Sequence, residues 1–258
     1  AGSSTTVASS PQPFQRRICF SRIFQSPSMA AYTSEPRPGV TVESSQALSP
    51  IKTFRIRKIM ENLGYTSVPA LLKYLRHAEQ LGLDIDQALA AAGINAEELT
   101  DNSKRMPSET HERLLGHLLA VSDDPLFGLH CARFVQPGSW SVLGYITMNC
   151  ATLGEAMSRI VPYEKLVGDM GVSRVEAGAD HVRLIWTCRH QAEPIRRHMV
   201  ENVLASWLLY ARWISDSDSS PREVWFEHAL PEGADIAEYQ TIFGCPIRFE
   251  QSCNALIV

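Results

Sequence analysis

Metal binding is the first chemistry that the residue types allow, because the chain has eight histidines and six cysteines. His111 and His117 lie six positions apart, so they occupy different faces of a helix, whereas a zinc-binding helix places two histidines four positions apart. Cys188 and His190 could bind a metal only with two distant partners that the sequence does not identify, and no Cys-x-x-Cys occurs. His198 and Glu201 stand three positions apart and could share one ligand face, although a solvent-facing hydrogen bond between them is the commoner outcome. We therefore expect neither a metal ion nor another cofactor.

Nucleophilic chemistry has equally little support. Glycine-rich phosphate loops and the Gly-x-Ser-x-Gly elbow are absent. Ser141 or Cys188 could serve a small hydrolase or transferase, but no base stands at a recognisable spacing from either. His130 could bind haem iron, although a lone histidine on an apolar helix is more often a core residue. We expect no catalytic residues, and a haem or gas sensor and a small hydrolase stay as alternatives.

Aromatic side chains are more informative, since tryptophans and tyrosines gather in the middle of the chain beside several arginines. Apolar walls with a few oriented polar groups are what a small-molecule pocket needs. The arginines would receive a carboxylate or phosphate. The alternative is a solid aromatic core with solvated arginines. The residues that we expect to bind a ligand are Trp140, Tyr145, Arg183, Trp186, Arg196 and Trp207.

Composition limits the function classes. Of the 258 residues, 45% are hydrophobic and 20% charged, which is ordinary for a soluble globular protein. The net charge is −4, whereas a dedicated nucleic-acid-binding domain is usually basic, so we expect no DNA binding by this chain alone. The cysteines are scattered, which favours free thiols in a reducing cytosol. No apolar run is long enough to predict a membrane span.

The first part of the chain differs from the rest. Residues 1–50 hold eleven serines and six prolines, and Glu35 and Glu43 are their only acidic residues. Such a segment cannot bury enough apolar surface to offset its ordering entropy. We expect residues 1–65 to be a disordered or non-native extension, with a transit peptide as the alternative, and one ligand-binding domain over residues 66–258.

Hydrophobic periodicity predicts the elements of that domain. Helical spacing covers 69–81, 85–92, a segment that begins at Ser108 as N-cap, 125–134, 141–148, 152–167, 193–214 and 235–243. Strand spacing covers 172–176, 182–187, 221–229 and a final hairpin of 246–249 with 254–258. The order predicts an α+β fold, with a helical N-terminal part followed by a mostly antiparallel sheet covered on one face by helices.

These elements also predict where a pocket would lie. The helix over 193–214 carries a continuous apolar stripe and must lie on the sheet. Trp186 and Trp207 would then face one another across the layer between sheet and helix. The segments that carry Trp140 and Tyr145 would close the other side.

Several short segments resemble the arabinose-binding-type N-terminal domain of AraC/XylS regulators over roughly residues 66–258. They begin at Val68 (VPALL), Leu81 (LGLDI), Ala92 (AGI), Asp124 (DPLFGLH), Leu143 (LGY), Ala151 (ATLGEA), Tyr239 (YQTIFGCPIRF) and Asn254 (NAL). The resemblance implies a bacterial, cytoplasmic regulator whose domain senses a small-molecule effector and supports a homodimer. In this family a C-terminal helix-turn-helix domain binds DNA. This chain lacks it and stops in an apolar run, so we expect a truncation.

Overall fold

The computed structural model describes residues 64–258, which form eight α-helices and two β-sheets. The expectation of a disordered or non-native extension concerns residues that lie almost wholly outside this range. The described part has the expected α+β fold, with its helices concentrated in the N-terminal half. None of its helices is long and apolar enough to cross a membrane.

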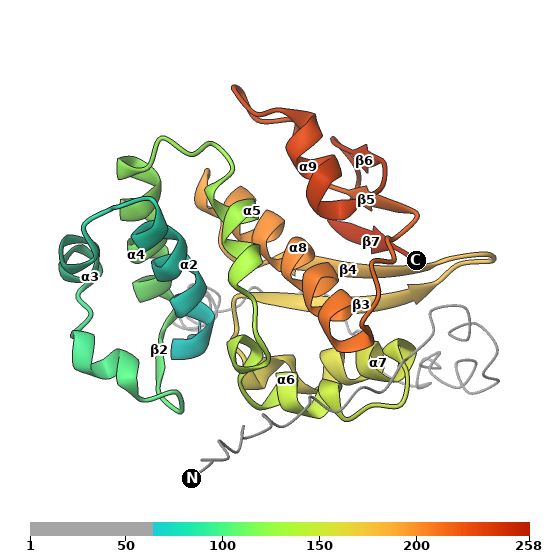
Figure 1. Cartoon of the computed structure of the whole chain (residues 1–258), viewed down its shortest axis with the longest axis horizontal. Helices are drawn as coiled ribbons and strands as arrows, with labels where there is room; N and C mark the ends of the chain where they lie inside the picture. The colour runs from blue at the N-terminus through green and yellow to red at the C-terminus, as the bar shows by residue number, and fades with distance from the viewer. Residues whose placement is uncertain (1–63) are drawn as a thin grey trace, which may run out of the picture.

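Three helices form a front end at one side of the molecule (Figure 1). They are α2 (Val68–Gln80), α3 (Ile85–Ala92) and α4 (Ser108–Val121). A short 3-10 helix (Ala96–Thr100) follows α3, and strand β1 (Tyr65–Ser67) pairs antiparallel with β2 (Arg105–Pro107) beneath them.

Local sequence determines both ends of α3 and the start of α4. The Asp84 carboxylate accepts a hydrogen bond from the Gln87 amide at 2.9 Å, and Gly93 ends α3 in the left-handed conformation at φ 71°. The expectation that Ser108 caps α4 is wrong by one residue. Pro107 occupies the cap because its strand runs directly into the helix, and the Ser108 amide bonds to the Gly64 carbonyl at 3.0 Å.

Shorter helices connect the front end to the sheet. These are α5 (Phe127–Cys131), two 3-10 helices (Ala132–Phe134 and Pro137–Trp140), α6 (Ser141–Met148), α7 (Leu153–Tyr163) and a 3-10 turn (Glu164–Leu166). Thr152 caps α7 by accepting a hydrogen bond from the Glu155 amide at 3.0 Å.

The main sheet has the strand order β3-β4-β7-β5-β6. Its strands are β3 (Gly171–Ala177), β4 (Val182–Cys188), β5 (Glu223–Trp225), β6 (Ile247–Arg248) and β7 (Ala255–Ile257). All neighbours are antiparallel except β5 and β6.

The expected final hairpin is therefore wrong, because β5 lies between β6 and β7. Helix α9 (Ile236–Phe243) joins β5 to β6, and a helical crossover is what two parallel neighbours require. Strand β7 instead pairs with β4 on one side and β5 on the other.

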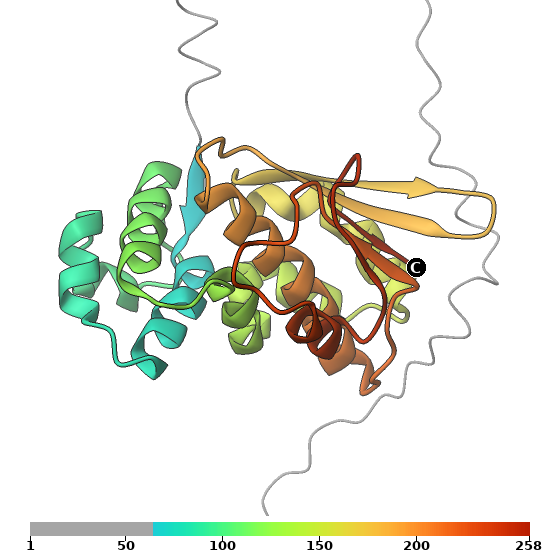
Figure 2. The same cartoon turned by 90° about the horizontal axis from the view of Figure 1, so that it is seen from above.

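Helix α8 (Ile195–Ser215) crosses one face of the main sheet (Figure 2). Leu184, Trp186 and Leu256 share a buried cluster with it. Ile185 and Ile257 belong to a separate, smaller cluster, as the alternation of strand side chains dictates.

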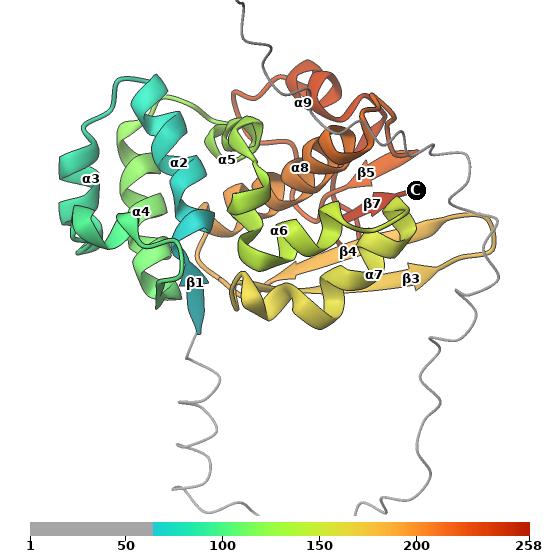
Figure 3. The same ribbon diagram turned by 60° about the horizontal axis from the view of Figure 1, so that its bottom comes forward.

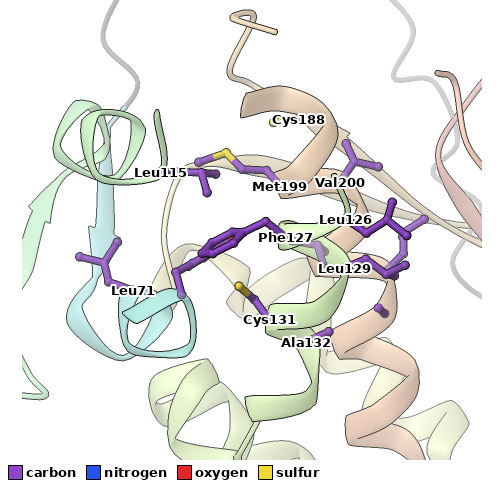
Figure 4. Close-up of a cluster of buried hydrophobic side chains, with 14 of the residues drawn as sticks. Leu71, Leu115, Leu126, Phe127, Leu129, Cys131, Ala132, Cys188, Met199 and Val200 are labelled. Carbon is purple, nitrogen blue, oxygen red and sulfur yellow. The ribbon is translucent and has the colours of Figure 1, made fainter. Parts of the chain in front are cut away.

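Phe127 lies at the centre of the main core, fully buried among Leu71 of α2, Leu115 of α4 and Met199 of α8 (Figure 4). Gly128 lets α5 approach α8 closely, because a Cβ there would overlap the carbonyl of His198. This contact holds the front end against the helix that covers the sheet.

Candidate functional site

A cavity of about 270 Å³ lies between helices α6 and α7 on one side and α8 with strands β4 and β7 on the other. Figure 3 shows these elements beside one another. The apolar stripe of α7 forms one wall with Leu153, Ala156, Met157 and Ile160. The opposite wall is formed by Leu184, Trp207, Leu208, Ala211, Ile214 and Leu256.

Polar groups in this wall are engaged with the protein itself. The Tyr210 hydroxyl donates to the Gly144 carbonyl at 2.6 Å, and the Thr147 hydroxyl lies 2.9 Å from the same carbonyl oxygen. Arg222 stands at the wall with its side chain 55% exposed, and it pairs with Asp180 at 3.0 Å. The cavity therefore offers apolar contact and few free hydrogen-bonding groups.

Two of the six residues expected from the sequence line this cavity, namely Trp140 and Trp207. Trp186 lines a second, smaller cavity of about 20 Å³, which also includes Trp140. Tyr145 is 57% exposed and lines neither cavity.

Both expected arginines lie away from the large cavity. Arg183 pairs with Glu176 at 2.8 Å, and by strand alternation it faces away from α8. Arg196 pairs with Glu227 at 2.6 Å. It lies in the first turn of α8, eleven residues before Trp207, which is about 16 Å along a helix.

The smaller cavity is lined by a buried lysine that the sequence pattern does not single out. Lys73 of α2 is only 5% exposed and lines this cavity together with His111, Trp140 and Trp186. Its ammonium lies 5.0 Å from the centroid of the Trp140 ring. A lysine in a helix gives no sequence signal of burial, since this residue type is normally exposed.

A buried polar cluster surrounds Glu201 in the second turn of α8. The Tyr239 hydroxyl donates to its carboxylate at 2.5 Å and Arg197 does so at 3.0 Å. Burial raises the pKa of Glu201 to about 7, although Arg197 opposes this shift. Arg197 also donates to the Pro125 carbonyl at 3.0 Å, so the cluster joins α8 to α9 and to the start of α5.

His77, Asp124 and His130 form a group that sequence spacing did not reveal. Their ligand-type atoms lie within 4.8 Å of one another, and imidazole with carboxylate is a donor set that zinc accepts. Asp124 accepts hydrogen bonds from His77 at 2.9 Å and from His130 at 2.8 Å. Burial opposes ionisation, but these hydrogen bonds hold the pKa of Asp124 well below its usual range.

The alternatives kept open by the sequence find little support in this geometry. His130 uses its second ring nitrogen to contact Glu238 at 2.9 Å, so neither nitrogen is free for haem iron. Burial raises the pKa of the Cys188 thiol to about 12, which keeps it protonated. Within residues 64–258, no side chain hydrogen-bonds to the Ser141 hydroxyl.

One family model matches most of the chain. The profile described as "Arabinose-binding domain of AraC transcription regulator, N-term" matches residues 82–258. A comparison with curated proteins gives no match. The chain is also similar to the crystal structure of the transcriptional regulator CdpR from Pseudomonas aeruginosa, with a TM-score of 0.46 and 19% sequence identity. That similarity covers 67% of this chain and 52% of the other, so the chain spans about half of its length.

Proposed function

The chain belongs to the family of arabinose-binding N-terminal domains of AraC transcription regulators, and from this premise we propose that it is the effector-sensing module of such a regulator. The effector binds in the cavity between α6, α7, α8 and the sheet. The observation that carries this proposal is the largely apolar wall of the cavity, which is the usual lining of a small-molecule site.

Cavity size and chemistry define the class of effector. An apolar cavity of about 150 Å³ holds one benzene molecule, so a volume of about 270 Å³ suits roughly two six-membered rings. A sugar would bury several hydroxyls against a wall whose own hydroxyls already bond to backbone carbonyls. Unsatisfied hydroxyls are costly to bury. The effector is therefore a largely apolar molecule rather than arabinose.

Membership of this family supports the other parts of the proposal, which are the homodimer, the cytoplasmic location and the control of DNA binding. The module works as a homodimer in the bacterial cytoplasm. It controls DNA binding by the helix-turn-helix domain of the regulator. Sedimentation of the chain at tens of micromolar tests the dimer, and a purely monomeric boundary contradicts it.

Naphthalene is a suitable probe of the cavity because it has two fused rings and no polar group. We expect it to raise the midpoint of thermal unfolding of the 258-residue chain, since a ligand that binds only the folded state stabilises it. Isothermal titration calorimetry gives the affinity.

A cavity-filling substitution makes this test specific. Ala211→Phe places a ring inside the cavity and should abolish naphthalene binding while the chain stays folded. Ala91→Phe on the exposed side of α3 is the matched control and should bind naphthalene as the wild type does. Equal binding by wild type and Ala211→Phe would refute the proposal.

A further inference from the structure

The smaller cavity lies between the front end and the sheet, at the junction of α2, α4 and α8. Its volume of about 20 Å³ exceeds the 10–15 Å³ or so that a single water molecule needs. Trp140 lines both this cavity and the large one. The two spaces are therefore neighbours that share one indole ring.

Lys73 is the charged residue of this smaller cavity. Its ammonium is 5.0 Å from the Trp140 ring centroid and 5.5 Å from that of Tyr74. In the part of the chain that the structure describes, no carboxylate or carbonyl accepts a hydrogen bond from it. An ammonium has three donors, and a buried charge is normally paired, so this arrangement lacks an anion.

Two further buried nitrogens around the same cavity have no partner among residues 64–258. These are Nε1 of Trp140 and Nε2 of His111. An indole nitrogen is a donor only. Nδ1 of His111 donates to the Met170 sulfur at 2.9 Å, so Nε2 of the neutral ring is an acceptor. Unpaired buried donors are rare in folded proteins, so the Trp140 N–H beside the Lys73 ammonium calls for an acceptor that both can reach.

We propose that the effector carries a carboxylate, which binds the Lys73 ammonium and the Trp140 indole N–H in the smaller cavity, while its apolar body fills the large cavity. This inference rests on the proposed effector-sensing function. It narrows the ligand to an aromatic or aliphatic acid with a compact body of roughly ten carbon atoms. Trp140 lies at the junction of the two parts and contacts both of them.

Charges around Lys73 predict how binding depends on pH. Burial lowers the pKa of Lys73 to about 8. The titratable groups facing it are Tyr74 of α2, His111 of α4 and Cys131 of α5. Burial raises the pKa of Tyr74 and Cys131 well above their usual values and lowers that of His111 well below. All three stay neutral between pH 7 and 9, so Lys73 alone changes charge there.

The direction of the pH dependence follows from the lowered pKa of Lys73 in the free protein. A bound carboxylate favours the charged lysine and raises its pKa, so binding takes up a proton once the free protein has lost it. Affinity for a carboxylate should be constant between pH 7 and 7.5. It should then weaken by up to about tenfold for each pH unit above 8.

The experiment compares 2-naphthoate with naphthalene by calorimetry on the 258-residue chain. We expect 2-naphthoate to bind the wild type with the pH dependence described and naphthalene to bind without it. Lys73→Met should weaken 2-naphthoate about tenfold to a hundredfold, the range for a hydrogen bond to a charged group, and leave naphthalene unchanged. Arg76→Met is the matched control, because it removes an exposed cation from the same helix at a position that lines neither cavity, and it should leave both affinities unchanged.

Each outcome bears on the proposal. An unchanged affinity of Lys73→Met for 2-naphthoate overturns it, as does an equal loss caused by Arg76→Met. Naphthalene binding without 2-naphthoate binding refutes the carboxylate but keeps the proposed function. The proposed function and the carboxylate site are both supported if Ala211→Phe binds neither ligand and Lys73→Met loses 2-naphthoate alone. If Lys73→Met does not fold, the pH dependence of the wild type decides, and a flat profile from pH 7 to 9.5 refutes the inference.

Discussion

Replacing Lys73 by methionine should stabilise this protein at neutral pH, although it removes a charged group that we assign to ligand binding. Methionine has nearly the same length and no charge, so it can occupy the same enclosed space. Burial lowers the pKa of Lys73 from 10.5 to about 8. At roughly 1.4 kcal/mol for each pKa unit, holding this ammonium in the folded state costs about 3 kcal/mol.

Part of that cost is offset by the aromatic ring beside the ammonium. A desolvated cation–π contact contributes about 1–2 kcal/mol, and methionine loses it. The net gain of Lys73→Met should therefore be about 1–2 kcal/mol at pH 7. For a domain of this size, this corresponds to a rise of about 2–8 °C in the thermal midpoint.

The pH dependence of this gain has a definite sign. The pKa of Lys73 is lower in the folded chain than in the unfolded chain, so the unfolded chain binds more protons between about pH 8 and 10.5. The stability of the wild type relative to the variant therefore rises across that interval. The advantage of Lys73→Met should shrink as the pH increases from 8.

Urea denaturation of both proteins at pH 7 and pH 9.5 measures these differences. Lys165→Met is the matched control, since Lys165 is exposed in the turn after α7, and it should change stability at neither pH. A Lys73→Met protein that is less stable than the wild type at pH 7 would refute the reasoning. An advantage of equal size at both pH values would refute it as well.

Four other expectations can be measured directly. Gly128→Ala should destabilise the fold by about 3 kcal/mol or more in urea denaturation, because its methyl group overlaps the backbone of His198. Gly116→Ala in α4 meets only a side chain at 3.5 Å and should be neutral or stabilising by up to about 1 kcal/mol. Thr152→Ala removes the hydrogen bond to the Glu155 amide and should cost about 1 kcal/mol, whereas no loss would show that this cap is dispensable. The chain should show no nanomolar, sequence-specific DNA binding at physiological salt in a gel shift, given its net charge of −4.

Elements with local stop and start signals could be predicted from the sequence. The helix at 85–92 has its bounds as expected, because Asp84 and Gly93 act on neighbouring backbone groups only. The order of two strands, a long helix, a strand, a short helix and two strands after residue 170 is also confirmed. The pairing of the last strands was wrong, because strand spacing in sequence does not reveal which strand inserts between two others.

The candidate site was predictable only in its apolar part. Trp140 and Trp207 were expected beside a pocket, and both line the large cavity, whereas Tyr145 of α6 is 57% exposed. The arginines were assigned from their residue type, and both pair with nearby carboxylates instead. Charge pairing depends on distances across the fold, which a linear sequence does not contain.

Sequence by itself determined the class of this protein, its helix and strand periods and the apolar stripe of α7, because these depend on neighbours within one or two turns. Tertiary structure alone decided that Lys73 is buried. Its helix is enclosed by α4, α5 and the 3-10 turn that carries Trp140, so a position next to the apolar stripe loses its water as well. A charged side chain indicates a functional site when it is buried without a partner of opposite charge. Burial and pairing are set by contacts between elements that lie far apart in the chain.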